Sequence, residues 1–378
     1  MVSINRERNL VILELNGGND ALNTMVPYNN GLYYDFRRNI GIPQEDVLKI
    51  DGEVGFNPNL GPIKELFDQG SLAVINGIGY PTPSRSHFRA KDIWYTAEPE
   101  KVGTQGWLGA AIRDLDAKGE NVLTGVNFGR GLPRAMALTG VPVASVAVLE
   151  GYGVLTGIAG QEQRARALDV FERMYSPAIG TGATMDYLGR TGLDALKGAD
   201  ILKTAADSYT STIEYAETGI AQSLRGMAQV IFKGLGTRVL YTSQGGYDTH
   251  ASQVSVQTPL LSDLSAGIGD FFADLSEHDA ADNVMMLVFT EFGRRVKDNG
   301  SGSDHGSGGG CYLIGQPVKG GTLGDYPSLK EEDQLDGDLH FNVDFRSVYS
   351  TIVDKWLGLD AQTAIGGNYE TLDFVRSN

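Results

Sequence analysis

The 378-residue chain has a single cysteine, Cys311, and no long hydrophobic run. One cysteine excludes an intramolecular disulfide and any cysteine-rich zinc or iron–sulfur site. Because Cys311 lies in an apolar segment that is typical of a strand, we predict a buried structural thiol rather than a nucleophile. No apolar segment approaches the roughly 20 residues that a membrane-spanning helix needs.

Basic residues are also scarce, with 31 Lys and Arg against 47 Asp and Glu and a formal net charge of −16. This balance argues against nonspecific binding to nucleic acids or to anionic membranes, which requires basic patches. The N-terminal residues lead directly into an apolar strand pattern and contain no signal-peptide core. We therefore expect a cytoplasmic protein, or a periplasmic or extracellular one if a leader has been removed.

The length allows either one large α/β domain with an insertion or two domains. We predict a single domain over residues 1–378. Residues 160–234 differ from the rest, because they are rich in Ala, Leu and Glu with apolar positions at helical spacing. This segment is predicted to be a helical insertion within the domain.

A short apolar run at residues 284–289 ends abruptly in polar residues and glycine. This pattern is typical of a buried parallel strand that delivers its carboxyl end to a loop. In open α/β sheets the ligand site lies at such carboxyl ends. Glu291 and Arg294 follow the strand directly, and Asp304 and His305 follow in a loop rich in Gly and Ser.

Other predicted strands are also followed by residues that can take part in catalysis or bind a metal or an anion. Residues 9–15 are followed by Asp20, residues 71–77 by Ser84, Ser86 and His87, and residues 237–243 by Asp248 and His250. Turn formation alone is the alternative role for Asp20. Ser84 or Ser86 can cap the helix that follows, or bind an anion at its N-terminus beside Arg85 and His87.

Together these residues predict a site for one or two divalent metal ions and a tetrahedral anion. Imidazole and carboxylate ligands two positions apart, as in Asp248 and His250, suit zinc, manganese or iron. Such a metal activates a serine hydroxyl or a water molecule, and Arg294 or Arg85 can hold oxygens that are not transferred.

At these positions the chain also resembles a known family, the bacterial domain-of-unknown-function family 1501 of the alkaline phosphatase-like (sulfatase-like) superfamily. The resemblance covers essentially the whole chain. Its motifs are Gly17-Gly18-Asn19-Asp20 followed by Asn23-Thr24, Ser84-Arg85-Ser86-His87-Phe88, Gly106-Trp107-Leu108-Gly109, Asp248-Thr249-His250-Ala251, Thr290-Glu291-Phe292-Gly293-Arg294-Arg295, Asp304-His305-Gly306 and Asp344-Phe345-Arg346-Ser347. The resemblance implies an α/β/α sandwich with a mostly parallel central sheet, and metal-dependent hydrolysis of phosphate or sulfate esters.

The resemblance also implies roles for single residues. Ser86, or alternatively Ser84, corresponds to the nucleophile. Apart from the resemblance, the residues themselves predict His87 and Arg294 as further catalytic residues. The implied metal ligands are Asp20, Asp248, His250, Glu291 and His305, and Asp304 is predicted as a further ligand from its place beside His305. Phe292 stands where the superfamily has a histidine, which removes a nitrogen ligand from a second metal. The expected cofactor is therefore one or two ions of zinc, manganese, magnesium or calcium, or none.

The sequence favours a metal-dependent hydrolase of phosphate or sulfate esters that uses a serine nucleophile. Its expected partner is an anionic small molecule or a polysaccharide ester. The alternative is a non-catalytic protein of the same fold that binds anions or polysaccharides, which Phe292 favours. A third hypothesis is hydrolysis of a carboxylic ester by Ser86 with His87 or His250 as base, although the chain has no nucleophile elbow around this serine.

Overall fold

The computed structural model describes residues 8–147, 149, 161–176, 179–207 and 209–376. Its centre is a sheet with the strand order β11-β5-β10-β9-β1-β8-β6-β7, and β12 pairs with β5. The strands are β1 (Asn9–Asn16), β5 (Leu72–Gly79), β6 (Gly125–Phe128), β7 (Ala144–Val146), β8 (Val239–Gly245), β9 (Val284–Phe289), β10 (Gly309–Ile314), β11 (Gly321–Leu323) and β12 (Val343–Asp344). This confirms the predicted α/β fold with a mostly parallel sheet.

Strands β8, β1 and β9 are neighbours and run parallel, so their carboxyl ends reach the same edge of the sheet. Strand β10 is antiparallel to both β9 and β5. Because two reversals restore the direction, β5 also points its carboxyl end to that edge. The edge therefore collects the loops that follow β1, β5, β8 and β9.

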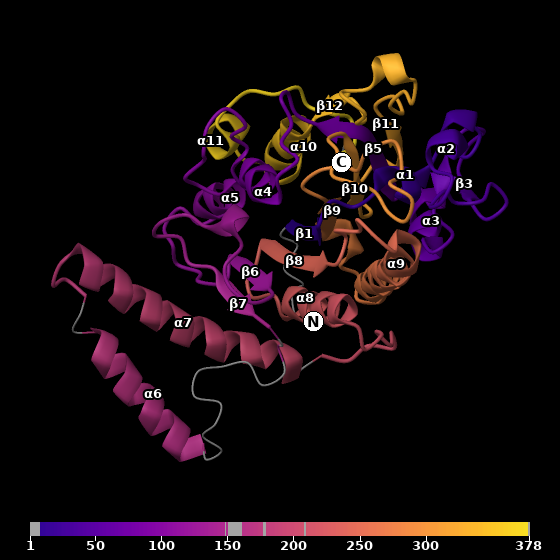
Figure 1. Cartoon of the computed structure of the whole chain (residues 1–378). Coiled ribbons are helices and arrows are strands. Elements are labelled where there is room, and N and C mark those ends of the chain that lie inside the picture. The colour runs from indigo at the N-terminus through magenta and orange to yellow at the C-terminus, as the bar shows by residue number, and fades with distance from the viewer. Residues whose placement is uncertain (1–7, 148, 150–160, 177–178, 208, 377–378) are drawn as a thin grey trace.

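Helices cover both faces of the sheet (Figure 1). One layer contains α3 (Gly61–Asp68), α8 (Gly219–Lys233) and α9 (Gln253–Glu277), and the other contains α4 (His87–Thr96), α5 (Trp107–Leu115), α10 (Phe345–Thr351) and α11 (Ala361–Ile365). Successive side chains of β1 alternate between the layers: Leu13 packs in the first core and Ile12 in the second. Both faces are buried, which explains why β9 is apolar at every position and why Leu10, Val11, Ile12 and Leu13 of β1 form an apolar run.

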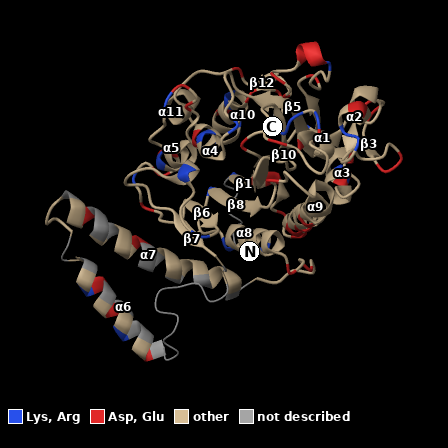
Figure 2. Ribbon diagram, in the orientation of Figure 1, with Lys and Arg blue, Asp and Glu red and all other residues tan. Residues whose placement is uncertain are grey.

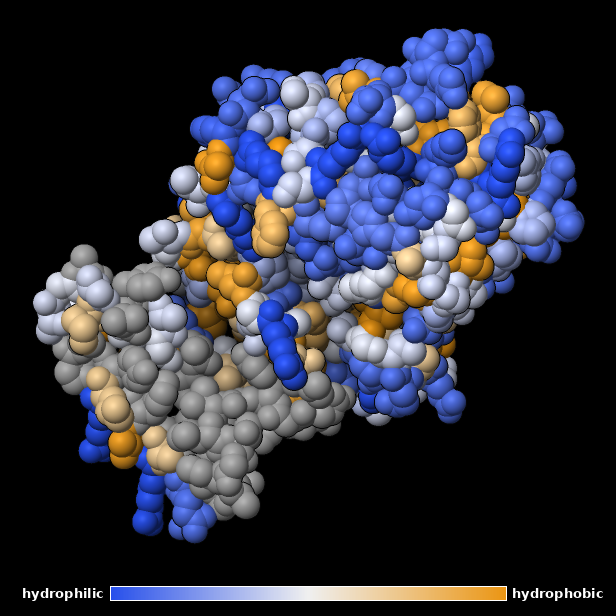
Figure 3. Space-filling view, viewed as in Figure 1, coloured by the Kyte–Doolittle hydropathy of each residue, from blue (hydrophilic) through white to orange (hydrophobic). Residues whose placement is uncertain are grey.

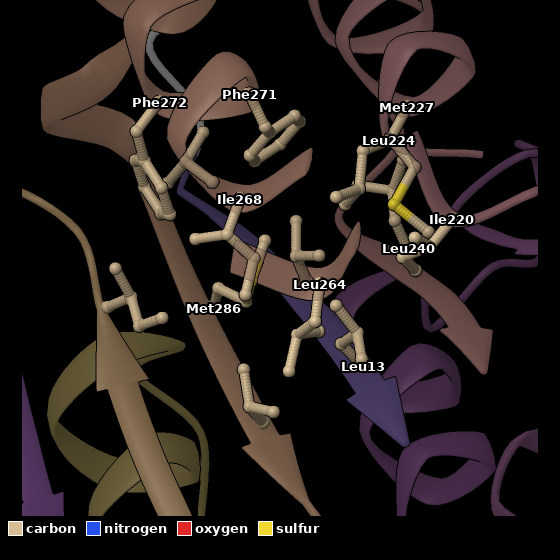
Figure 4. Packing of buried hydrophobic residues seen from close by; sticks show 14 of the residues in the cluster. Leu13, Ile220, Leu224, Met227, Leu240, Leu264, Ile268, Phe271, Phe272 and Met286 are labelled. Carbon is tan, nitrogen blue, oxygen red and sulfur yellow. The ribbon is translucent and has the colours of Figure 1, made fainter. Parts of the chain in front are cut away.

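Figure 4 shows how α8 and α9 pack on the sheet. Leu264 and Ile268 of α9 face Leu13 of β1 and Met286 of β9, and all four side chains are at most 2% exposed. Burial of side chains of this size stabilises the fold by about 1.5–3 kcal/mol each. Cys311 is buried in β10, as predicted, and burial raises the pKa of its thiol.

A second, smaller sheet has the order β2-β4-β3 and lies beside the main sheet. Its region contains α1 (Ala21–Thr24), β2 (Met25–Val26), α2 (Gly31–Phe36), β3 (Leu48–Lys49) and β4 (Gly55–Phe56). Single turns of 3-10 helix occur at Arg134–Met136, Ala281–Asn283 and Glu331–Asp333, and one π-helical turn occurs at Ile352–Trp356.

Two further helices, α6 (Gln161–Tyr175) and α7 (Ala183–Asp207), extend from the body of the molecule, and α7 also contacts α8 (Figure 1). They fall in the segment 160–234 that the sequence predicts to be a helical insertion. That domain division stays a prediction, and residues 160, 177, 178 and 208 lie outside the described residues.

Among the described residues, no helix has both the length and the apolar character needed to span a membrane. Acidic side chains lie on several helices and loops rather than being gathered in one region (Figure 2). The face of the molecule shown in Figure 3 is largely hydrophilic, with scattered apolar residues.

Candidate metal centre

Three segments, those after β5, β8 and β9, meet at the carboxyl edge of the sheet and bring histidines and carboxylates together. The loop after β8 carries Asp248 and His250, and the loop after β9 carries His305. His87 is the first residue of α4, in the segment that follows β5. The common edge explains why residues far apart in sequence become neighbours.

The Nε2 atoms of the histidines converge on Asp248. His305 Nε2 and His250 Nε2 lie 3.0 and 3.1 Å from Asp248 Oδ1, and 2.9 Å from each other. His87 Nε2 lies 3.4 Å from Asp248 Oδ2. Three imidazole nitrogens therefore surround one carboxylate.

The Nδ1 atom of each of these histidines has an acceptor on the opposite side of its ring. These pairs, each 2.8 Å long, are His87 with Glu291 Oε1, His250 with Asp304 Oδ1, and His305 with the carbonyl oxygen of Arg85. A histidine that donates from Nδ1 to a carboxylate or carbonyl keeps the Nε2 lone pair for a metal, which is the arrangement usual among metal-binding histidines. In this tautomer each neutral ring directs its Nε2 lone pair to the centre of the cluster, where a metal ion would accept it; in the absence of a metal, a proton on Nε2 of His305 makes the hydrogen bond to Asp248 instead.

The donor atoms fit a metal ion. Ligand atoms of His87, Asp248 and His305 all lie within 4.8 Å of one another. His87 Nε2 is buried and has no hydrogen-bond partner among the described residues, so it is the kind of polar atom that an ion would satisfy. His250 Nε2, at about 3 Å from two of these atoms, completes a set of nitrogen and oxygen ligands of the type preferred by zinc, manganese or iron.

Asp248 is ionised under ordinary conditions. Its partial burial would raise the pKa, but the hydrogen bonds from His305 and Arg294 outweigh this effect and lower the pKa to about 2. The carboxylate thus supplies a negative charge at the point where the imidazoles meet.

Glu291, a predicted metal ligand, lies against Nδ1 of His87, whereas Asp248 faces Nε2 of the same ring. Its side chain is fully buried, accepts the backbone N–H groups of Gly17 and Gly18, and binds Nδ1 of His87. Since Oε1 lies against the ring nitrogen, Glu291 orients the imidazole.

Asp304 has the equivalent position beside His250. It is about half exposed, and it also accepts a hydrogen bond from Asn299 at 3.2 Å. The hydrogen bond with His250 is the main cause that lowers the pKa of Asp304. Neither Glu291 nor Asp304 directs a carboxylate oxygen at the other histidines in the contacts described.

Asp20 is engaged elsewhere. Its carboxylate is buried, forms an ion pair with Arg37, accepts from Gln253 and caps α1 through the N–H of Leu22. None of the contacts of Asp20 in the described structure is with a histidine. Arg37, which pairs with Asp20, lies in none of the sequence motifs, so this ion pair could not be predicted from the sequence.

Arg294 is 1% exposed and links the loops of the site. Its guanidinium donates to Asp248 Oδ1 and to carbonyl oxygens, those of Gly17, Gly18, Tyr247 and Ser303. These bonds position Asp248, and they keep the guanidinium buried, where it has no contact with solvent. Arg85, the other candidate for binding an anion, is paired with Asp338 and Asp336.

Ser86 occupies the N-cap position of α4, but its side chain makes no capping hydrogen bond. Its hydroxyl is exposed, and its backbone N–H donates to Ser84 Oγ at 3.2 Å. Ser84 Oγ therefore stabilises the turn, whereas the Ser86 hydroxyl stands without a partner in the described structure, directly before His87.

Phe292 packs beside the histidines. Its ring centroid lies 4.8 Å from that of His87 and 4.7 Å from that of His305. Gly18, with a φ of 76°, approaches the same ring so closely that a Cβ atom would lie 2.3 Å from it. The phenyl ring thus closes one side of the cluster.

Residues 189–370 match the model of a family described as "Protein of unknown function (DUF1501)". No curated protein matches the chain. Among solved structures, the sulfatase PsFucS1 from Pseudoalteromonas sp. is similar with a TM-score of 0.42 and 12% identity, covering 98% of this chain and 71% of the other. The phosphonate monoester hydrolase of Agrobacterium radiobacter gives a TM-score of 0.40 and 12% identity, covering 96% and 78%. Ps i-CgsB in complex with k-i-k-neocarrahexaose gives 0.42 and 13%, covering 96% and 73%. At these identities the likeness concerns the fold alone.

Proposed function

Since the match places this chain in the DUF1501 family, whose description gives no function, we propose an activity from its site: metal-dependent hydrolysis of phosphate or sulfate esters. The observation that carries the proposal is the convergence of the Nε2 atoms of His87, His250 and His305 on Asp248. An imidazole cluster with each Nδ1 anchored and each Nε2 directed inward is built to hold a cation.

The residues that hold the metal in this proposal are Asp248, His305, His87 and His250. A nitrogen-rich set favours zinc or manganese over magnesium and calcium, which prefer oxygen ligands. We propose one ion, because Asp20 is committed to Arg37 and Glu291 to His87. When bound, the ion supplies Lewis acidity that lowers the pKa of a coordinated hydroxyl or water and stabilises developing negative charge.

Ser86 is the proposed nucleophile. Its hydroxyl is exposed, makes no capping bond and precedes the ligand His87. The N-terminus of α4, a helix of 10 residues, favours the negative charge of a phosphate or sulfate group through its backbone N–H groups and dipole. Arg294 acts indirectly, because its bond to Asp248 fixes the carboxylate among the imidazoles.

Binding without turnover is the second candidate, and the state of the arginines favours it. Arg294 is buried against carbonyl oxygens, and Arg85 is paired with Asp338. Both guanidinium groups already have partners, so neither is available to stabilise negative charge on a transferred group. In phosphoryl transfer, such stabilisation contributes much of the rate enhancement. A protein of this kind would bind phosphate or sulfate esters without cleaving them.

The two candidates are separated by metal analysis of protein purified without chelator, followed by assays on an aryl phosphate and an aryl sulfate. Hydrolysis predicts about one bound ion, activity that metal supplementation restores after chelation, and loss of that activity in Ser86→Ala and His305→Ala. Ser84→Ala is the matched variant and should keep measurable turnover. Ester affinity without turnover would support the binding protein. A chain without metal under all these conditions would contradict the hydrolase, and the absence of ester affinity as well would contradict both.

A further inference from the structure

Lys91 lies close to the candidate metal centre, and the proposed chemistry assigns it no role. Lys91 follows His87 by four positions on α4, so both side chains leave the same face of the helix. Its Nζ donates to Asn16 Oδ1 at 2.6 Å, and lies 3.8 Å from Glu14 Oε1 and 3.9 Å from Glu291 Oε1. The ammonium group therefore stands between two buried carboxyl groups.

The two carboxyl groups differ in their hydrogen-bond partners. Glu14 accepts hydroxyl groups of Tyr241 and Tyr95 at 2.5 and 2.7 Å, but its burial is the dominant effect and raises its pKa. Glu291 instead receives two backbone N–H groups and the His87 ring. A buried carboxylate requires a nearby opposite charge, and Lys91 supplies it.

We infer that Lys91 is a positioning residue that acts through Glu291 on His87. The ammonium keeps the carboxylate of Glu291 directed at Nδ1, which holds the ring proton on Nδ1 and leaves the Nε2 lone pair facing Asp248. The lysine also joins the end of β1, through Asn16, to the helix that carries His87. This role rests on the proposed function in one respect, namely that Nε2 of His87 binds the metal.

The first test uses metal-free protein, so it does not depend on metal binding or turnover. Ring-nitrogen NMR of selectively labelled histidine reports which nitrogen of His87 carries the proton. The wild type and Lys91→Arg are expected to show the Nδ1–H form, and Lys91→Met a mixture of both tautomers. Lys64→Met removes a lysine that pairs with Asp68 on the surface of α3 and serves as the control. An unchanged Nδ1–H form in Lys91→Met would overturn the inference.

The second test measures the affinity for Zn²⁺ and Mn²⁺ by calorimetry in a double-mutant cycle. Lys91→Met is expected to weaken binding about 10-fold, within the 10–100-fold range for outer partners of metal ligands. In a Glu291→Gln background the same change should have no further effect, because Lys91 acts through that carboxylate. Fully additive losses would overturn the pathway through Glu291. If the wild type and His305→Ala both fail to bind metal while the tautomer result holds, the proposed function fails and the positioning role stands.

Discussion

Asp304 accepts a hydrogen bond from Nδ1 of His250 at 2.8 Å, although 54 positions of sequence separate the two residues. Both side chains are about half exposed, so this bond adds little to folding stability. Its consequence is local: it turns Nε2 of His250 towards Asp248 and His305. The carboxylate thus organises the site from outside the set of donor atoms.

Asp304→Asn is therefore expected to weaken metal binding about 10-fold without a measurable change in the temperature of unfolding. The amide oxygen still accepts a hydrogen bond, but it lacks the charge that makes the imidazole a better ligand. Titration calorimetry with Zn²⁺ measures the effect, and Asp373→Asn, an exposed carboxylate paired with Lys319, is the control. Complete loss of binding in Asp304→Asn would show instead that Asp304 itself binds the metal.

The sequence was informative about the strands and their ends. The apolar run 284–289 coincides with β9, because a strand buried on both faces needs apolar residues at every position. The same reasoning brought Asp248, His250 and His305 to one edge of the sheet, where the structure has them.

The sequence could not assign the outer partners. Glu291 and Asp304 look like ligands because carboxylates bind metals, yet each one faces an Nδ1 atom of a histidine far away in sequence. Such pairings depend on the exact separation of loops across the sheet edge. Asp20 illustrates the same limit, since its partner Arg37 lies in an irregular segment without periodicity.

The stability of the metal-free protein should depend on Asp248 at acid pH. The pKa of this carboxyl is about 2 in the folded state, below its ordinary value of 3.8. Because the pKa is lowered by folding, the ionised carboxylate stabilises the fold at pH values above its pKa in the unfolded chain. This contribution is lost as the pH falls from about 4 towards 2. Because the side chain is partly exposed, we expect a small effect. The free energy of unfolding, measured with urea, should fall less steeply with decreasing pH in Asp248→Asn than in the wild type. Equal slopes would contradict the lowered pKa of Asp248.

The pair of Asp20 and Arg37 is expected to be structural. Both side chains are at most 1% exposed, and Arg37 also donates to the carbonyl oxygens of Val296 and Arg295. Arg37→Met leaves a buried carboxylate unpaired and should cost about 3–5 kcal/mol of unfolding free energy. Calorimetric unfolding measures this loss. Asp20→Asn should retain metal affinity within about twofold at a temperature where it is folded, whereas abolished binding would restore Asp20 as a ligand.

Phe292→His tests what limits the number of metal ions. The family resemblance implies that Phe292 replaces a nitrogen ligand, and the centroid of its ring lies within 5 Å of those of the His87 and His305 rings. A new imidazole there would still lack a carboxylate for a second ion, because Asp20 remains paired with Arg37 and Glu291 remains bound to His87. We therefore expect metal analysis to give the same stoichiometry of about one ion in Phe292→His as in the wild type. Phe292→Leu keeps an apolar side chain and controls for the lost packing of the phenyl ring. A second equivalent in the histidine variant alone would show that the aromatic residue, rather than the commitment of the carboxylates, keeps the second ion out.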